Sequence, residues 1–204
     1  LQRIADGVHH DPHSVLGVHE RLDRQTCLAY LPATRDARVG GQPMQRVGDS
    51  DFFAWEAPLG TLHGHLPIAW QDGHGDWHQR IDPYGFLPTI GATDLEEFAG
   101  GRHVAAWRFL GAQPLQIDGI AGVRFAVWAP NAARVSVVGP FCDWDGRRLP
   151  MRVLGGSGVW ELFAPGLGVG EFYKFEIRSR HDGALTLKSD PYSRASELRP
   201  ATAS

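Results

Sequence analysis

Short runs of alternating apolar and polar residues recur along the second half of the chain. Val, Phe, Val and Ala alternate with Arg, Ala and Trp over residues 123–129, and a second run follows a Pro-Asn corner at residues 134–138. We expect these two segments to form a hairpin-like β unit. Turn-forming residues bound three further predicted strands, at residues 159–164, 172–178 and 185–188.

The first half of the chain shows the same spacing of short apolar runs. Strands are predicted there at residues 26–31, 51–57, 65–70 and 77–82. Short strands with turn signals about every 8–12 residues are typical of an antiparallel β-sandwich. Each half of the chain is therefore expected to form a sandwich.

A short helical segment is predicted between the two halves. We expect Thr93 to cap a helix over residues 94–98, and Gly100 and Gly101 to end it before a second helical piece at residues 104–110. The segment carries the large apolar side chains of Phe98, Trp107, Phe109 and Leu110. This pattern indicates a linker that packs between modules and is not a free tether.

The two halves also share landmarks in the same order, which indicates a diverged tandem repeat. The pairs are Leu16-Gly17-Val18 with Leu110-Gly111-Ala112, Tyr30-Leu31-Pro32 with Trp128-Ala129-Pro130, Ala37-Arg38-Val39 with Ala133-Arg134-Val135, Phe53-Ala54-Trp55-Glu56-Ala57-Pro58 with Trp160-Glu161-Leu162-Phe163-Ala164-Pro165, and Asp82-Pro83-Tyr84 with Asp190-Pro191-Tyr192. We predict an all-β fold of two tandem immunoglobulin-like antiparallel β-sandwiches, residues 1–100 and 101–204, joined by the short helical linker.

Composition and charge exclude several classes of partner. The chain has 204 residues with 43% apolar and 21% charged positions, a net charge of −3, 25 Gly, 14 Pro and 7 Trp. A slightly acidic chain with scattered arginines offers no basic face for nucleic acid, and no apolar run reaches the ~18 residues of a membrane span. We therefore expect neither nucleic acid nor a membrane as a partner.

Cysteine usage favours a reducing compartment. Cys27 and Cys142 are too few for a disulfide framework and form no CxxC spacing, so a cytoplasmic location is expected. The chain begins at Leu1, and no charged segment followed by an apolar one opens it. We expect the natural start of the protein to lie upstream.

The residues that catalysis or metal binding needs do not come together in the sequence. Neither a nucleophile motif nor a phosphate-binding loop is present. Eight of the ten histidines fall in the first 80 residues, but Gly75 and Asp76 place the pair His74 and His78 in a loop, where surface or capping roles are expected. We predict no catalytic residue, no metal and no cofactor.

An aromatic side chain in a polar turn is the strongest candidate for a binding site. Trp144 lies between Asp143 and Asp145, which we expect to stabilise the turn and not to act as an acid and base pair. An indole face suits the apolar face of a sugar ring, while Asp143 and Lys174, which projects from a predicted strand, can bind its hydroxyls. Alternatively, Trp144 packs on Arg147 or on a partner domain.

These residues occur in motifs that resemble a known family. The motifs are Phe125-Ala126-Val127-Trp128-Ala129-Pro130-Asn131-Ala132, Val135-Ser136-Val137-Val138-Gly139, Trp144-Asp145-Gly146-Arg147, Pro150-Met151-Arg152, Gly158-Val159-Trp160-Glu161-Leu162-Phe163, Tyr173-Lys174, Asp190-Pro191-Tyr192 and Arg199-Pro200-Ala201-Thr202-Ala203-Ser204. They resemble the glycogen-binding-type module of bacterial 1,4-α-glucan (glycogen) branching enzymes. The segment His10-Asp11-Pro12-His13-Ser14-Val15-Leu16-Gly17 is similar to the opening of the extra N-terminal module found in the longer members.

The resemblance implies that the parent enzyme cuts an α-1,4-glucan and transfers the cut chain to form an α-1,6 branch, using carboxylates of a (β/α)8 barrel. The present chain contains no barrel, so we expect it to have no catalytic activity alone. Its expected partners are α-glucan (glycogen and maltooligosaccharides) and that barrel. It either binds glucan and helps to set the transferred chain length, or packs on the barrel as a purely structural region.

The sequence departs from the family pattern at three places in the second module. Cys142 replaces an Asn, Pro140 replaces an Asp or Ser, and only Leu185 and Leu187 stand where a second platform Trp is common. We therefore expect weak glucan affinity. The corresponding segments of the first module, residues 40–44 and 65–68, have neither the aromatic turn nor the lysine, so glucan binding is expected only in the second module.

Overall fold

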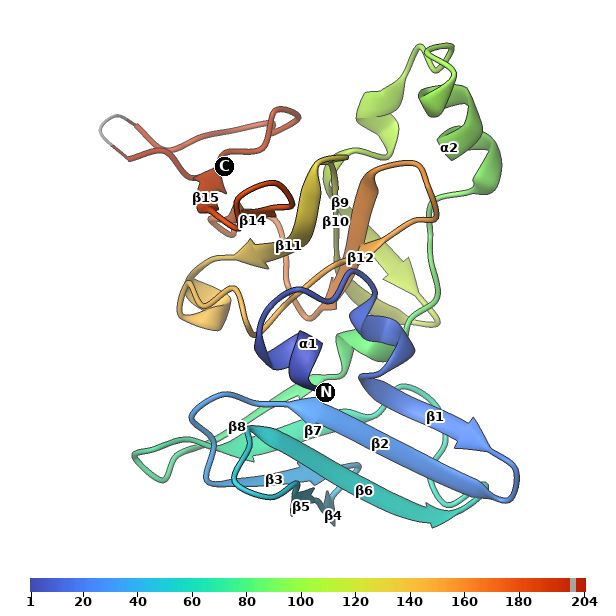
Figure 1. Ribbon diagram of the computed structural model, residues 1–204, viewed down its shortest axis with the longest axis vertical. Helices are drawn as coiled ribbons and strands as arrows, with labels where there is room; N and C mark the ends of the chain where they lie inside the picture. The colour runs from blue at the N-terminus through green and yellow to red at the C-terminus, as the bar shows by residue number, and fades with distance from the viewer. Residues whose placement is uncertain (199–200) are drawn as a thin grey trace. The chain divides into compact units, whose positions relative to one another are not determined.

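The computed structural model describes residues 1–198 and 201–204 and divides the chain into two compact units (Figure 1). The first unit comprises Leu1 and Pro12–Phe86, and the second comprises Gln2–Asp11 and Leu87–Ser204. Residues 87–100, assigned to the first module on sequence grounds, thus belong to the second unit. Arg199 and Pro200, part of the closing motif, lie outside the described residues.

The first unit contains two four-stranded sheets. In one sheet the strand order is β1 (Gly17–Arg21), β2 (Arg24–Tyr30), β6 (Phe52–Pro58) and β5 (Gln45–Arg46); in the other it is β4 (Gln42–Pro43), β3 (Asp36–Val39), β7 (Pro67–Gln71) and β8 (Trp77–Ile81). All neighbouring strands are antiparallel. Alternate residues such as Cys27, Ala29, Val39 and Phe53 fill the core, as strands with a period of two require. Short 3₁₀ turns at Pro12–Ser14 (η1) and Pro83–Gly85 (η2) complete the unit.

The second unit contains a four-stranded and a three-stranded sheet. The first has the order β12 (Arg152–Val153), β13 (Val159–Pro165), β10 (Ile120–Trp128) and β9 (Gly111–Ile117); the second has β11 (Ala132–Val138), β14 (Lys174–Ser179) and β15 (Leu185–Lys188). The helical elements of this unit are α1 (Gln2–Ala5), α2 (Ala92–Ala99), η3 (Ala106–Arg108) and η4 (Pro140–Cys142). Each of the nine strands predicted from the sequence corresponds to a strand of one unit or the other.

Strand order shows that the two units share one topology. The order β1-β2-β6-β5 corresponds to β9-β10-β13-β12, and β3-β7-β8 corresponds to β11-β14-β15. The repeated landmarks meet in the same way: Gly17 (φ +90°) lies against Tyr84, and Gly111 (φ +86°) lies against Tyr192. An added Cβ would lie 3.1 Å from Tyr84 atoms and 3.0 Å from the Tyr192 Cβ, so both positions favour glycine. The fold of two tandem antiparallel sandwiches is confirmed.

The predicted hairpin of residues 123–129 and 134–138 is wrong. Both segments are strands, but β10 and β11 lie in different sheets. Both edges of β10 are already occupied, by β9 on one side and β13 on the other, so β11 pairs with β14 instead. The Pro130-Asn131 corner therefore carries the chain from one sheet to the next.

In the linker, the first helix is longer than predicted and has a different cap, and the second helical piece is shorter. Helix α2 follows Gly91, which occupies the N-cap position with extended backbone, so the capping role predicted for Thr93 is wrong. Gly100 ends the helix as predicted. The second piece is only the 3₁₀ turn η3. Phe98 and Phe109 meet edge to face and pack with Ala126 of β10, so this segment covers the outer face of the second unit's own four-stranded sheet (Figure 1).

Candidate functional site

The turn that follows β11 holds Trp144 in a defined conformation. The Gly139 carbonyl accepts hydrogen bonds from the Cys142 N–H at 3.1 Å and the Trp144 N–H at 3.0 Å, which folds residues 139–144 into a compact loop. The Cys142 thiol lies in this loop and contacts the Val137 carbonyl at 3.9 Å. Cys142 is therefore a buried, apolar side chain that packs at the base of the turn.

Two successive side-chain-bearing residues of this turn adopt left-handed backbone. Asp143 has φ +55° and Trp144 has φ +57°. Asp tolerates this region, but for an aromatic residue it is uncommon and costs roughly 1–2 kcal/mol. Such strain persists where the surrounding structure fixes it, and it concentrates at functional sites. The conformation of Trp144 therefore supports a role beyond closing the loop.

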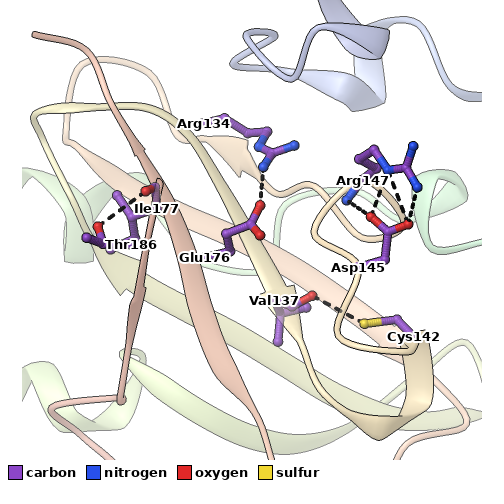
Figure 2. Close-up of polar contacts among 8 residues, drawn as sticks. All are labelled: Arg134, Val137, Cys142, Asp145, Arg147, Glu176, Ile177 and Thr186. Atoms are coloured by element: carbon purple, nitrogen blue, oxygen red, sulfur yellow. Dashed lines mark hydrogen bonds and ion pairs between the residues drawn. The ribbon is translucent and has the colours of Figure 1, made fainter. Parts of the chain in front are cut away.

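Asp145 stabilises the turn, as predicted. Its carboxylate accepts the Arg147 N–H at 2.9 Å and pairs with the Arg147 guanidinium at 2.7 Å (Figure 2). Burial raises the pKa of the Asp145 carboxyl, but the hydrogen bonds and charge of Arg147 outweigh burial, so the pKa lies below its ordinary value. The carboxylate stays ionised and bound to Arg147, which leaves it unsuited to acid catalysis.

Asp143 and Trp144 present their side chains to solvent. The Trp144 residue is 41% exposed, and the Asp143 side chain is 76% exposed. Asp143 lies 3.5 Å from the Arg148 guanidinium, a surface ion pair that contributes little stability. An exposed indole beside an exposed carboxylate offers a stacking surface and a hydrogen-bond acceptor at one place.

Lys174 begins β14 directly opposite Val138, the last residue of β11 before the turn. The sheet therefore brings Lys174 to the base of the turn that carries Asp143 and Trp144. The Lys174 ammonium donates a hydrogen bond to the Thr202 hydroxyl at 2.6 Å. That bond fixes the lysine and leaves further N–H donors for a ligand, because an ammonium group has three.

Register places further side chains on the face of the sheet that carries Lys174. Glu176 is two residues further along β14, and Leu187 lies opposite it on β15. Gly146 lies so close to Glu176 that an added Cβ would be 2.0 Å from the Glu176 Oε1 atom, so the turn lies over this face. We call the set Asp143, Trp144, Lys174, Glu176 and Leu187 the platform.

Glu176 and Thr202 were not identified from the sequence as site residues. Glu176 forms an ion pair with Arg134, which lies near the turn in Figure 2. The alternation of strand residues from Lys174 would have indicated Glu176, since i and i+2 share a face. No local signal indicates Thr202, because it is 28 residues from Lys174 in the chain.

Other candidate chemistry is limited in the described part of the chain. Residues 1–198 and 201–204 contain no group of three or more His, Cys, Asp or Glu side chains arranged to hold a metal ion. None of the helices among these residues has the length and hydrophobicity that crossing a bilayer requires. Cys27 and Cys142 are both buried, and they form no disulfide within the described residues.

Two family models match this chain. The model described as alpha-1,4-glucan branching enzyme GlgB, N-terminal domain, matches residues 1–84. The model described as Carbohydrate-binding module 48 (Isoamylase N-terminal domain) matches residues 109–193, which include the platform residues from Asp143 to Leu187.

Curated relatives match the chain from end to end. The 1,4-alpha-glucan branching enzyme GlgB of Methylococcus capsulatus is 52% identical over 100% of this chain and 28% of the relative, and that of Cellvibrio japonicus is 49% identical over 100% and 29%. The chain thus spans less than a third of these proteins. Among solved structures, the alignment with ligand-free PulA from Klebsiella pneumoniae covers 87% of this chain and 20% of that protein, at 18% identity and a TM-score of 0.36.

Proposed function

The chain belongs to the N-terminal region of the GlgB family of 1,4-alpha-glucan branching enzymes, and from that premise we propose that its second unit binds α-glucan at the platform. The observation that carries the proposal is the exposed Trp144 ring, held in left-handed backbone beside Asp143 in the turn after β11, whose last residue Val138 pairs with Lys174.

The platform offers the two kinds of contact that a glucose unit needs. The indole of Trp144 stacks on the apolar face of a pyranose ring, and the Asp143 carboxylate accepts hydrogen bonds from hydroxyl groups. The Lys174 ammonium has further N–H groups that can donate to hydroxyl oxygens. Leu187, 54% exposed, widens the apolar surface without providing a second ring, so we expect weak binding.

For the whole protein we propose the activity in its relatives' name. It cleaves an α-1,4-glucan and transfers the released chain to form an α-1,6 branch, with carboxylates supplied from outside this chain. The unit described here would hold glucan near that chemistry and influence the length of the transferred chain. The 204 residues alone are expected to show no branching activity, and a cytoplasmic location is expected.

The test is glucan binding by the 204-residue chain and its Trp144→Ala variant. Electrophoresis in a native gel containing glycogen, with a titration of maltooligosaccharides, should show saturable retardation for the parent chain. Loss of the stacking ring should weaken binding about tenfold, equivalent to about 1.4 kcal/mol. If the Trp144→Ala chain were retarded by glycogen as strongly as the parent chain, the proposal would be overturned. Lys174→Met and Asp143→Asn should each have a smaller effect in the same direction.

A second candidate function is packing on the catalytic barrel, with no glucan binding. An apolar cavity of about 210 Å³ in the second unit favours it. The cavity is lined by Val169, Phe172 and Tyr192, which are 90%, 47% and 38% exposed. These exposed apolar side chains could pack against an apolar surface of the barrel. Absence of glucan binding by the 204 residues, with altered product chain lengths when the region is deleted from the whole enzyme, would favour this function.

A further inference from the structure

A polar cavity of about 470 Å³ lies within the second unit, apart from the platform. It is bounded by the segment from Thr89 to Phe109 and by Arg124 of β10. Three arginines, Arg102, Arg108 and Arg124, line it. We call it the linker cavity, because the segment that closes it leads into β9.

Arg124 is a buried guanidinium with unused hydrogen-bond donors. It is only 7% exposed and projects from the outer face of β10, the face that also carries Ala126. Its Nη1 donates to the Thr89 hydroxyl at 3.3 Å and its Nη2 to the Arg108 carbonyl at 3.2 Å. Its Nε has no partner among the described residues. A buried N–H without an acceptor is costly, so the guanidinium is not fully satisfied by the protein.

The charges around Arg124 do not balance within the buried layer. Glu161 is fully buried on the same face, but its carboxylate accepts the Thr89 N–H at 2.9 Å and faces Arg152 at 3.4 Å. Two buried guanidinium groups therefore share one buried carboxylate. Burial lowers the pKa of Arg124, partly offset by Glu161 and Asp94, yet an arginine keeps its charge at neutral pH. Arg124 itself forms no ion pair among the described residues, so an anionic ligand would supply the partner that it lacks.

The other two arginines add positive charge at the mouth of the cavity. Neither Arg102 nor Arg108 forms an ion pair with a carboxylate within the part of the chain that the structure describes. Arg108 is the last residue of η3, and its guanidinium lies 5.4 Å from the Trp107 ring. Guanidinium groups bind phosphoryl oxygens well, because their forked N–H donors match the spacing of those oxygens.

Two acidic side chains, Asp94 and Glu97, also line the cavity. His103 accepts the Ala105 N–H at Nδ1, at 3.2 Å, so its Nε2 carries the proton that it donates to Asp94 at 3.0 Å. Asp94 and Glu97, both from α2, supply carboxylate oxygens that accept hydrogen bonds from hydroxyl groups.

We propose that the linker cavity binds a phosphoryl group, with Arg124 and Arg108 on its oxygens. The volume exceeds that of phosphate alone, and the carboxylates of Asp94 and Glu97 suit hydroxyl groups, so the ligand is a phosphorylated monosaccharide. Its occupancy would add contacts between the linker segment and the outer face of β10, and so stabilise the second unit by mass action. The site is independent of glucan binding at the platform.

The test is calorimetric titration of the 204-residue chain at constant ionic strength in a phosphate-free buffer. The probes are glucose 6-phosphate, inorganic phosphate and glucose. We expect saturable binding of glucose 6-phosphate about tenfold tighter than that of inorganic phosphate, and no binding of glucose. Equal affinity for the two phosphates would make free phosphate the ligand of the same site. No binding of either phosphate would overturn the proposal.

A matched pair of variants locates the site. Arg108→Gln removes one guanidinium but keeps the backbone carbonyl that Arg124 uses, and it should weaken phosphate binding about tenfold. Arg35→Gln makes the same change in charge at an exposed residue of the first unit and should leave the affinity unchanged. Equal losses of phosphate affinity in the two variants would show that only net charge matters, and would overturn the assignment of binding to the linker cavity. Arg124→Gln should abolish binding, with circular dichroism to check that the variant folds.

Discussion

The two units share a strand order and differ mainly in one connection. In the first, β3 ends at Val39 and the two-residue turn Gly40-Gly41, with φ of +54° and +81°, leads straight into β4. In the second, the turn after β11 runs through η4 and Trp144 before the chain reaches β12. A tight hairpin has no room for an exposed ring, so the same fold carries a platform in one unit and a plain sheet edge in the other.

The Asp-Pro-Tyr motif has one structural role in both units but two different environments. The carboxylates of Asp82 and Asp190 accept the N–H of Tyr84 at 3.1 Å and of Tyr192 at 2.8 Å. Asp190 also accepts a hydrogen bond from the Tyr173 hydroxyl. The Oδ2 atom of Asp82 is buried without a partner among the described residues. Both copies of the motif therefore form the same turn, but only Asp190 accepts an additional hydrogen bond from a tyrosine hydroxyl.

The largest expected difference between the units concerns buried charge on the first sheet. In the second unit, Glu161 lies opposite Ala126 and is buried between Arg152 and Thr89. In the first unit, the uncharged Ala54 occupies the corresponding place opposite Leu28. Glu161→Ala leaves buried guanidinium groups unpaired and should lower the free energy of unfolding by about 3–5 kcal/mol. Chemical denaturation measures this loss, and hydrogen exchange of the native protein shows which strands it affects.

The loss should be confined to the second unit, where exchange from β10 and β13 should accelerate. Glu161→Gln is the control, because it removes the charge but keeps an acceptor for Thr89, and it should be less destabilising than Glu161→Ala. Equal effects on β2 and β10 would show that the two units unfold together and would remove the contrast.

The second largest expected effect concerns Asp82, whose environment differs from that of Asp190. Burial raises the pKa of Asp82 from 3.8 to about 6. The folded first unit therefore binds a proton that the unfolded chain releases, and its free energy of unfolding should rise by up to about 3 kcal/mol as the pH falls from 7 to 4. Asp82→Asn keeps an acceptor for the Tyr84 N–H, removes the charge and should abolish this dependence. Thermal unfolding across this pH range measures it.

Tyr173→Phe should make the second unit resemble the first. The substitution removes the hydroxyl that donates to Asp190 and leaves a buried carboxylate oxygen unpaired, at a cost of about 1–3 kcal/mol. Burial already raises the pKa of Asp190, and the Tyr173 hydrogen bond opposes that rise. The variant should therefore raise the Asp190 pKa further, as NMR titration of the carboxyl carbon can measure. An unchanged pKa would contradict the assigned role of Tyr173.

Periodicity and turn chemistry predicted most of the fold, because alternation and bounding glycines are local signals. The pairing of β11 with β14 was not predictable in this way, since it depends on both edges of β10 being occupied by distant strands. At the site, the polar surroundings of Trp144 indicated an exposed ring. The neighbours Glu176 and Thr202 come from register and from a contact across 28 residues, which local pattern does not encode.

The smallest expected effect is none, and it tests whether exposure alone makes a platform. Trp77 in the first unit is 44% exposed, close to the 41% of Trp144. The Arg38 guanidinium, however, lies 4.6 Å from the centre of the Trp77 ring and occupies one face of it. Trp77→Ala should leave glycogen retardation unchanged under conditions where Trp144→Ala weakens it. A comparable loss in both variants would give the first unit a glucan surface of its own and end the functional distinction between the two sandwiches.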